Sequence, residues 1–353
     1  MHILRFALLF ALCALLTQSC DKNEVNPTDR LDYAEVLLSV TDQVIVPTYD
    51  NLFQKSTVMV NTLNSLLAAQ TQVNLDAAQQ AWRDARIPWE QSEGFLYGPV
   101  ETLGIDPSID SWPVNQADLD AVLASGDVLT KTYIDGQEGT LKGFHTIEYL
   151  LFGSNSNKQV GDFTPRQFEY LAACAQSLQG ACQSLRDNWV GGTVKFGQTF
   201  KTAGQSGNAA YPSQKSALQE ILNGLITIAD EVANGKINEP YAQEDLLLEE
   251  SRFSVNSKAD FADNIRSIQN IYTGLYGSAS GKGLSEVVKA KNAALDTEVR
   301  QKIANAIAAI EAIEGTFTTA IFNAKPSVEK ARDEVRNLQE LLQNQVFAVI
   351  DGL

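Results

Sequence analysis

Two residues three positions apart give the strongest chemical signal in this sequence. They are His145 and Glu148, in the segment Gly-Phe-His-Thr-Ile-Glu. Because residues three apart share one face of a helix, the imidazole and the carboxylate can reach the same point. Both groups bind transition metals, and carboxylate also binds Fe³⁺. The pair therefore predicts a metal-binding site, although a hydrogen-bonded core histidine is the simpler alternative.

Further ligands for a metal at this pair would have to be oxygen atoms. The chain has only one other histidine, His2, which lies in an amino-terminal segment that we expect to be removed. An oxygen-rich ligand set favours iron or another exchangeable divalent or trivalent cation over a closed structural zinc site. The zinc-protease motif of two histidines and a glutamate on one helix is absent from the sequence.

A second candidate is a stripe of mixed chemistry between residues 81 and 95. Trp82, Arg86, Trp89 and Glu93 recur at helical spacing and share one face. The stripe is polar where a core-facing stripe would be apolar. Either Arg86 and Glu93 form a structural salt bridge, which the residues alone favour, or both point into a cleft with His145.

A third cluster spans residues 249–265. Within it, the segment from Ser254 to Ser257 is typical of an irregular turn that caps the next helix. Capping is therefore the simplest role for Ser254.

Helical patterns dominate the elements that must position these residues, and alternating β-branched runs are scarce. Helices are predicted over 31–70, interrupted at Pro47, and over 75–97, kinked or broken at Pro88. Further helices are predicted over 116–123, 140–152, 164–189, 212–234, 241–250, 258–276, 283–314 with a possible break, and 326–350. The fold class is therefore all-α. Residues 191–211 are rich in Gly, Ser, Gln and Asn, which predicts a boundary between two packed helical bundles, 31–190 and 191–353.

The amino terminus is typical of an export signal. Arg5 precedes an apolar run from Phe6 to Leu16, which is too short for a permanent membrane-spanning helix. The residues before Cys20 are similar to a bacterial lipobox. We predict a signal peptide over 1–19 and a lipidated Cys20 with a polar tether over 20–30; secretion without lipid is the alternative. The protein would then be a lipoprotein of the bacterial outer membrane, facing the periplasm or the surface.

The net charge limits the kinds of ligand that the protein can bind. The chain has 43 acidic and 27 basic residues, a net charge of −16. Such a surface repels nucleic acid and favours cations over anionic ligands.

Cys174 and Cys182 lie on one predicted helix with their Cα atoms about 12 Å apart, too far for a disulfide. Both are expected to be buried as small apolar residues.

The segment from Gly143 to Glu148 matches the GxHxxE motif of the imelysin-like family. The chain also resembles that family at residues 81–93, at the Ser-Trp-Pro of 111–113 and at 251–265. The resemblance extends from about Tyr33 to the carboxyl terminus. It implies two four-helix-bundle-like domains with a cleft at their interface, and a role in bacterial iron uptake.

The resemblance also implies which residues form the site. His145 and Glu148 would bind iron or an iron chelate, and Glu93 would supply another oxygen. Arg86 would orient a carboxylate or a ligand anion, and Trp112 would form an aromatic wall. Ser254 is a further cleft residue of the family pattern.

Two rival functions remain open from the sequence. The first is a metallopeptidase with His145 as ligand and Glu148 as base, which needs at least two more metal ligands. The scarcity of histidine argues against it. The second is a helical interaction module that docks onto an outer-membrane transporter.

Overall fold

The computed structural model describes residues 33–192 and 194–353. Its regular structure is almost entirely helical, which confirms the all-α prediction. Residues 33–353 belong to one compact unit. The predicted signal peptide, the lipidated Cys20 and the tether lie outside the described residues.

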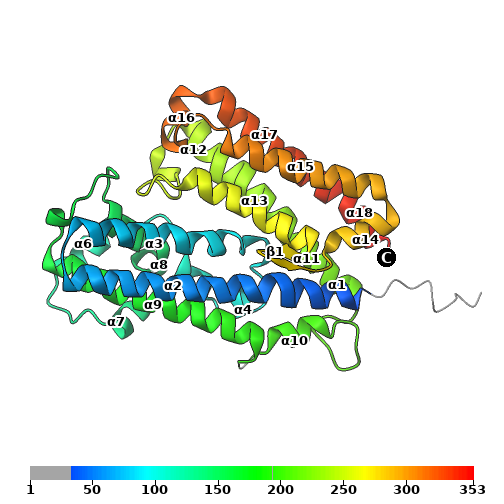
Figure 1. Ribbon diagram of the computed structural model, residues 1–353, viewed down its shortest axis with the longest axis horizontal. Coiled ribbons are helices and arrows are strands. Elements are labelled where there is room, and N and C mark those ends of the chain that lie inside the picture. The colour runs from blue at the N-terminus through cyan, green and yellow to red at the C-terminus, as the bar shows by residue number, and fades with distance from the viewer. Residues whose placement is uncertain (1–32, 193) are drawn as a thin grey trace, which may run out of the picture. The chain divides into compact units, whose positions relative to one another are not determined.

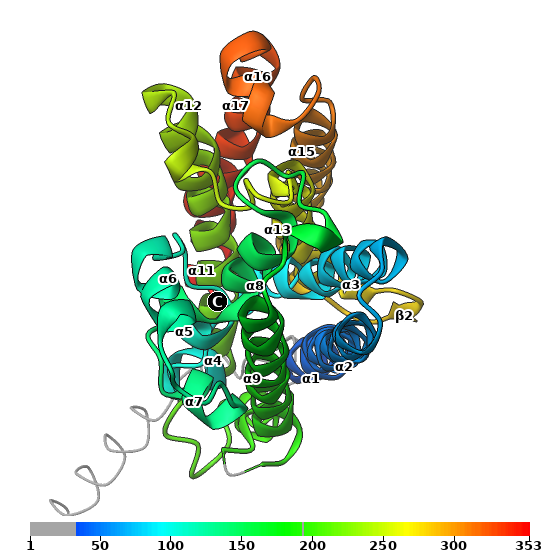
Figure 2. The same cartoon turned by 90° about the vertical axis from the view of Figure 1, so that its left-hand side faces the viewer.

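Four helices pack around the first part of the core (Figure 1). α2 contacts α3 and α9, and α8 lies against the same two helices, as Figure 2 also shows. Their bounds are α2 (Val46–Ala68), α3 (Gln72–Glu90), α8 (Gly143–Phe152) and α9 (Pro165–Val190).

Four further helices form the second part of the core. α13 contacts α11 and α15, and α17 contacts α11 and α15 in turn. The two sets meet where α13 contacts α3. Their bounds are α11 (Gln214–Asp230), α13 (Ser257–Thr273), α15 (Ala293–Glu311) and α17 (Lys325–Leu341). The domain boundary after residue 190 stays a prediction.

Shorter elements connect these helices. The α-helices are α1 (Ala34–Ser39), α4 (Pro99–Thr102), α5 (Asp106–Ile109), α6 (Gln116–Ala124), α7 (Lys131–Asp135), α10 (Phe196–Lys201), α12 (Asn238–Gln243), α14 (Leu284–Lys291), α16 (Phe317–Asn323) and α18 (Phe347–Asp351). The π-helical turns are η2 (Val40–Ile45), η6 (Glu231–Ile237) and η8 (Leu342–Val346), and the 3₁₀ turns are η3 (Glu93–Phe95), η4 (Gly139–Leu141), η5 (Val160–Asp162) and η7 (Leu246–Leu248). The strands β1 (Leu275–Tyr276) and β2 (Ala279–Ser280) form an antiparallel hairpin.

Side-chain caps explain where several long helices begin. The backbone N–H of Gln167 donates to the hydroxyl of Thr164, and Pro165 occupies the first position of α9. The predicted start of this helix is confirmed. Thr71 and Ser213 cap α3 and α11 in the same way.

Proline disturbs the helices less than the sequence predicted. α3 continues through Pro88 and ends at Glu90, so the predicted extension to residue 97 is wrong. Pro88 lies in the last turn, so only two residues of α3 follow the position where the backbone hydrogen bond is missing. Pro47 lies in the first turn of α2, and the π-helical turn η2 precedes that helix without a gap, so the chain stays helical across this proline.

The predicted helix over 241–250 is also wrong. α12 begins at Asn238, with Pro240 inside it, and ends at Gln243. Glu244 then adopts a left-handed conformation with φ of 51°, which stops the helix. Glu250 consequently lies in the irregular segment before α13.

Two smaller expectations can be checked in the described residues. Cys174 and Cys182 are buried free thiols, as predicted, and burial raises the pKa of each to about 12. Among the helices described, none combines the length and the apolar character that crossing a bilayer requires.

Candidate functional site

His145 and Glu148 lie on one face of α8, as their spacing predicts. The Nδ1 of His145 is 3.0 Å from the Oε2 of Glu148, and both side chains are fully buried. α8 begins at Gly143, with φ of +77°, where an added Cβ would lie 2.4 Å from the carbonyl oxygen of Ile109. Only glycine permits this close approach, which brings the residues after α5, including Asp110, next to His145.

Both oxygens of Glu148 are bound within the protein. Its Oε1 accepts hydrogen bonds from the backbone N of Ser254 at 2.7 Å and from the Ser254 hydroxyl at 2.8 Å. Its Oε2 faces His145. Ser254 lies in the predicted turn, but its side chain binds Glu148 instead of capping α13. Glu148 therefore fixes the orientation of the imidazole ring.

The other ring nitrogen of His145 faces two carboxylates. Its Nε2 is 3.2 Å from the Oδ1 of Asp110 and 3.8 Å from the Oε1 of Glu250, yet within the described residues it makes no hydrogen bond. Burial lowers the pKa of His145, but Asp110 and the neighbouring glutamates raise it well above its ordinary value. Asp110, His145 and Glu250 offer ligand atoms that all lie within 4.8 Å of one another.

Arg86 is the central cation of this cluster. Its fully buried guanidinium forms ion pairs with Asp110 and Glu90. Its Nη2 is also 3.0 Å from the Oε1 of Glu250 and 3.6 Å from the Oδ2 of Asp260. Burial lowers the pKa of Arg86, but these four carboxylates raise it well above its ordinary value.

Lys236 is a second buried cation, and it lies on the π-helical turn η6. Its Nζ is 2.9 Å from the Oε2 of Glu93 and 3.0 Å from the Oε2 of Glu250. In the described residues Glu93 therefore pairs with Lys236, and the salt bridge to Arg86 that the residues alone favoured does not form. Glu250 contacts both cations, one through each oxygen.

The buried cluster contains more acidic than basic groups. The acidic residues are Glu90, Glu93, Asp110, Glu148, Glu250 and Asp260, and the basic residues are Arg86, His145 and Lys236. Burial raises the pKa of Glu90 and Glu93 well above the ordinary carboxyl value, because the nearby cations offset it only in part. Burial also raises the pKa of Glu250, but Lys236, His145 and Arg86 together outweigh it, and the pKa falls to about 2. Protons on Glu90 and Glu93, or an added cation, would each reduce the excess negative charge of the cluster.

The predicted site residues converge through shared partners. Arg86 and His145 both face Asp110 and Glu250, and Glu148 joins Ser254 to His145. Glu93 reaches the cluster through its partner Lys236. Trp112 is half-buried and lines a pocket of about 330 Å³ with Glu93, Asp110 and Glu250.

The sequence did not identify five residues of the cluster: Glu90, Asp110, Lys236, Glu250 and Asp260. Asp110 directly precedes the Ser-Trp-Pro segment, and Glu250 lies in the third cluster, so each had a signal nearby. Lys236 had no such signal nearby, because a single lysine within a helical pattern is normally exposed to solvent.

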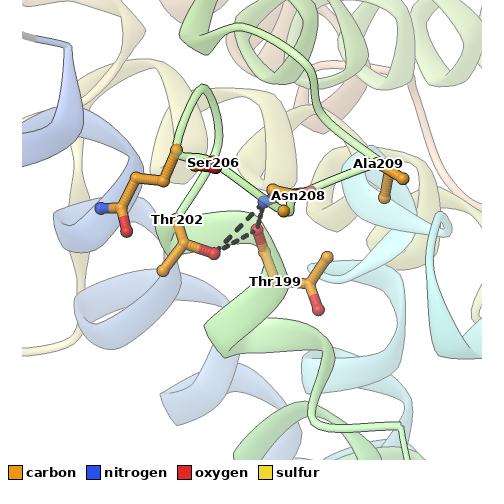
Figure 3. Close-up of a pocket in the computed structure, with 8 residues that line it drawn as sticks. Thr199, Thr202, Ser206, Asn208 and Ala209 are labelled. Atoms are coloured by element: carbon orange, nitrogen blue, oxygen red, sulfur yellow. Dashed lines mark hydrogen bonds between the residues drawn. The ribbon is translucent and has the colours of Figure 1, made fainter.

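A second pocket has a different chemical character. It encloses about 380 Å³ and is formed by α10 and the loop that follows it (Figure 3). The side-chain Nδ2 of Asn208 donates to the carbonyl oxygen of Thr199 at 2.6 Å and to the hydroxyl of Thr202 at 3.2 Å. Its lining residues are uncharged, so this pocket is a poor candidate for a cation.

Replacing Ser254 with alanine should destabilise the protein by about 1–2 kcal/mol, because one hydrogen bond to a buried carboxylate is lost. The backbone N–H of residue 254 still binds Glu148, which limits the loss. Urea denaturation measures the change. Ser285→Ala is the matched control, since the buried hydroxyl of Ser285 has no hydrogen-bond partner and its loss should be nearly neutral. Equal losses in the two variants would show that the hydroxyl does not hold Glu148.

The fold and the motif define the class of protein: an all-α chain with a GxHxxE helix at a buried acidic cluster. The chain belongs to the imelysin family, whose model, described as Peptidase M75: Imelysin, matches residues 45–345. The family resemblance of the sequence is thereby confirmed.

Similar proteins carry names that refer to iron. Iron-regulated protein A of Synechococcus elongatus is 28% identical over 342 residues, which are 96% of this chain and 91% of that protein. A crystal structure described as an iron-regulated protein A precursor from Parabacteroides distasonis is 27% identical, with a TM-score of 0.81 over 90% of this chain and 94% of that one. An imelysin-like protein from Psychrobacter arcticum shares the fold at 13% identity, with a TM-score of 0.72 over 90% and 96% of the two chains.

Proposed function

We propose that this protein binds an iron cation, or a related divalent or trivalent cation, through Asp110, His145 and Glu250. The observation that carries the proposal is the Nε2 of His145, which is buried, makes no hydrogen bond and faces two carboxylates. A nitrogen and several oxygen atoms form a ligand set that suits iron and neighbouring transition metals.

The charges around these three residues support a cation as the ligand. The buried carboxylates exceed the buried cations, and uncompensated buried charge is costly. A bound cation would relieve this imbalance. Arg86 and Lys236 each contact Glu250 and would hold it in place.

The proposal gives Glu148 a supporting role. We expected it to bind the metal directly, but its oxygens are taken by His145 and Ser254. A carboxylate behind a ligating histidine fixes the ring and increases its basicity. We therefore assign Glu148 to orienting His145, and Asp110 and Glu250 to contacting the cation.

The names of the relatives and the amino-terminal sequence support a proposed cellular role. The relatives named as iron-regulated support a role in iron uptake. Lipidation at Cys20 would anchor the protein to the outer membrane of the bacterial cell envelope, where a transporter could be its partner. Cys20→Ala should then release the protein from membranes, and a membrane-bound Cys20→Ala variant would contradict the anchor.

Equilibrium dialysis against Fe²⁺ without oxygen, followed by mass-spectrometric metal analysis, tests the binding function. We expect the wild type to retain about one iron per chain and His145→Ala to retain none while keeping its helix content. A wild type that retains no iron, or a His145→Ala variant that retains it equally well, would contradict the proposal.

The peptidase alternative is tested with the same protein. A base must reach the metal-bound water, whereas Glu148 is held behind the ring by two partners. Metal-loaded protein should therefore leave denatured casein intact. Cleavage that disappears in both His145→Ala and Glu148→Ala would restore the peptidase reading.

A further inference from the structure

The pocket beside the cluster is the starting point. It encloses about 330 Å³, and its lining includes Asp110 and Glu250, the two carboxylates that also face His145. A ligand that enters this pocket therefore reaches the oxygen atoms of the proposed metal site. The pocket also has three apolar lining residues, Leu96, Trp112 and Leu248.

The charged residues of the pocket are mostly acidic. They are the carboxylates Glu93, Asp106, Asp110, Glu231, Glu239 and Glu250, together with the single ammonium group of Lys236. Glu231 and Glu239 are exposed, Asp106 is half-buried, and Glu93 and Glu250 are buried. Acidic groups thus extend from solvent to the inner end of the pocket.

The positive charge of Lys236 does not make the electrostatic potential of the pocket positive. The Nζ of Lys236 lies between Glu93 and Glu250, 2.9 and 3.0 Å from their oxygens, and 3.9 Å from the Oε1 of Glu231. Its charge is shared among carboxylates of the pocket and is not free to bind a ligand anion.

We propose that the pocket admits the free, hydrated metal cation and excludes iron that is held by an anionic chelator such as citrate. This inference rests on the proposed function and names the form in which the cation arrives. Clefts lined by one sign of charge attract ions of the opposite sign and repel ions of the same sign. The negative charge of a ferric citrate complex would meet a mostly acidic lining and one ammonium group that is already paired.

Two observations support a small cation as the occupant. The Nε2 of His145, which is fully buried and has no hydrogen bond within the described residues, lies next to Asp110 and Glu250. It is a ligand atom for a bare metal ion and is too deeply buried to contact a bulky chelate. Six waters at about 30 Å³ each occupy about 180 Å³, so a hydrated cation fits the volume of the pocket.

The rate of association tests this inference. Electrostatic attraction speeds the encounter between the cation and the protein, and dissolved salt screens that attraction. Stopped-flow mixing of the full chain with Fe²⁺ without oxygen should show an association rate that falls steeply as NaCl is raised. Ferric citrate with excess citrate should show no binding. The double variant Glu231→Gln/Glu239→Gln removes the exposed charges of the pocket, and its association rate with Fe²⁺ should fall by about three- to tenfold at low salt.

Glu286→Gln/Glu298→Gln is the matched control. Both residues are exposed on α14 and α15, outside the pocket, so the control changes net charge equally. Its association rate should stay close to that of the wild type. Equal rates in the two double variants would overturn the inference, as would ferric citrate binding that is lost in His145→Ala. That second result would leave the proposed function standing, whereas a wild type that binds neither form of iron would refute both.

Discussion

Replacing Arg86 with methionine should lower the free energy of unfolding by about 3–5 kcal/mol, because removing one partner of a buried ion pair leaves the other charge uncompensated. Here the guanidinium is fully buried and faces Glu90, Asp110, Glu250 and Asp260. Methionine preserves much of the side-chain volume, so the loss reports charge more than packing. Urea denaturation followed by circular dichroism measures it.

An exposed arginine provides the control for this prediction. Arg300 pairs with Asp296 on α15 at 3.0 Å, but its side chain is 42% exposed. Exposed ion pairs contribute about 0–1 kcal/mol, and Arg300→Met should cost no more than that. The double variant Arg86→Met/Glu90→Gln should recover part of the loss, because one carboxylate no longer needs a counter-charge. A similar loss in Arg86→Met and Arg300→Met would show that Arg86 does not neutralise the cluster.

Replacing Glu250 with glutamine should weaken Fe²⁺ binding by at least about 100-fold, whereas Glu148→Gln should weaken it by about 10- to 100-fold. The reason for this order is position. Glu250 faces the unbonded Nε2 of His145, but Glu148 binds the Nδ1 on the other side of the ring. The first substitution removes a proposed ligand of the metal, whereas the second only loosens the imidazole ring.

Isothermal titration calorimetry without oxygen gives these affinities, with circular dichroism to confirm that each variant is folded. Glu249→Gln is the matched control, because Glu249 is the buried neighbour of Glu250 and accepts hydrogen bonds from Ser257 and Thr318. Its affinity should stay close to that of the wild type. The reverse order of losses for Glu148 and Glu250 would make Glu148 the direct ligand.

Local patterns in the sequence predicted the parts of the site that depend on one helix. The spacing of His145 and Glu148 was enough to place both on one face of α8, and Thr164 with Pro165 marked the start of α9. Each of these features is decided by residues within about one helical turn.

Long-range packing decided the parts that the sequence did not predict. Asp110 reaches His145 because Gly143 allows the backbone of α8 to approach Ile109 closely. The helical spacing of residues in the sequence cannot predict such a contact between distant segments. Helical spacing put Arg86 and Glu93 on one stripe, but α3 ends at Glu90. Glu93 therefore leaves the stripe and pairs with a lysine far along the chain.

Glu250 shows how an error in secondary structure displaces a site residue. The pattern over 241–250 favoured a helix, which would have made Glu250 one acidic residue on a helical surface. The left-handed conformation of Glu244 ends α12 early, and the irregular segment before α13 brings Glu250 into the cluster. Conformations of this kind are set by the surrounding structure and have no clear sequence signal outside glycine and asparagine.

Crystals soaked with Fe²⁺ without oxygen, measured on both sides of the iron absorption edge, test the central claim most directly. We expect one anomalous peak in the cluster, about 2.0–2.4 Å from the Nε2 of His145 and from oxygens of Asp110 and Glu250. Glu148 should keep its contacts with His145 and Ser254. A peak bound by Glu148, or iron found only outside this cluster, would contradict the account.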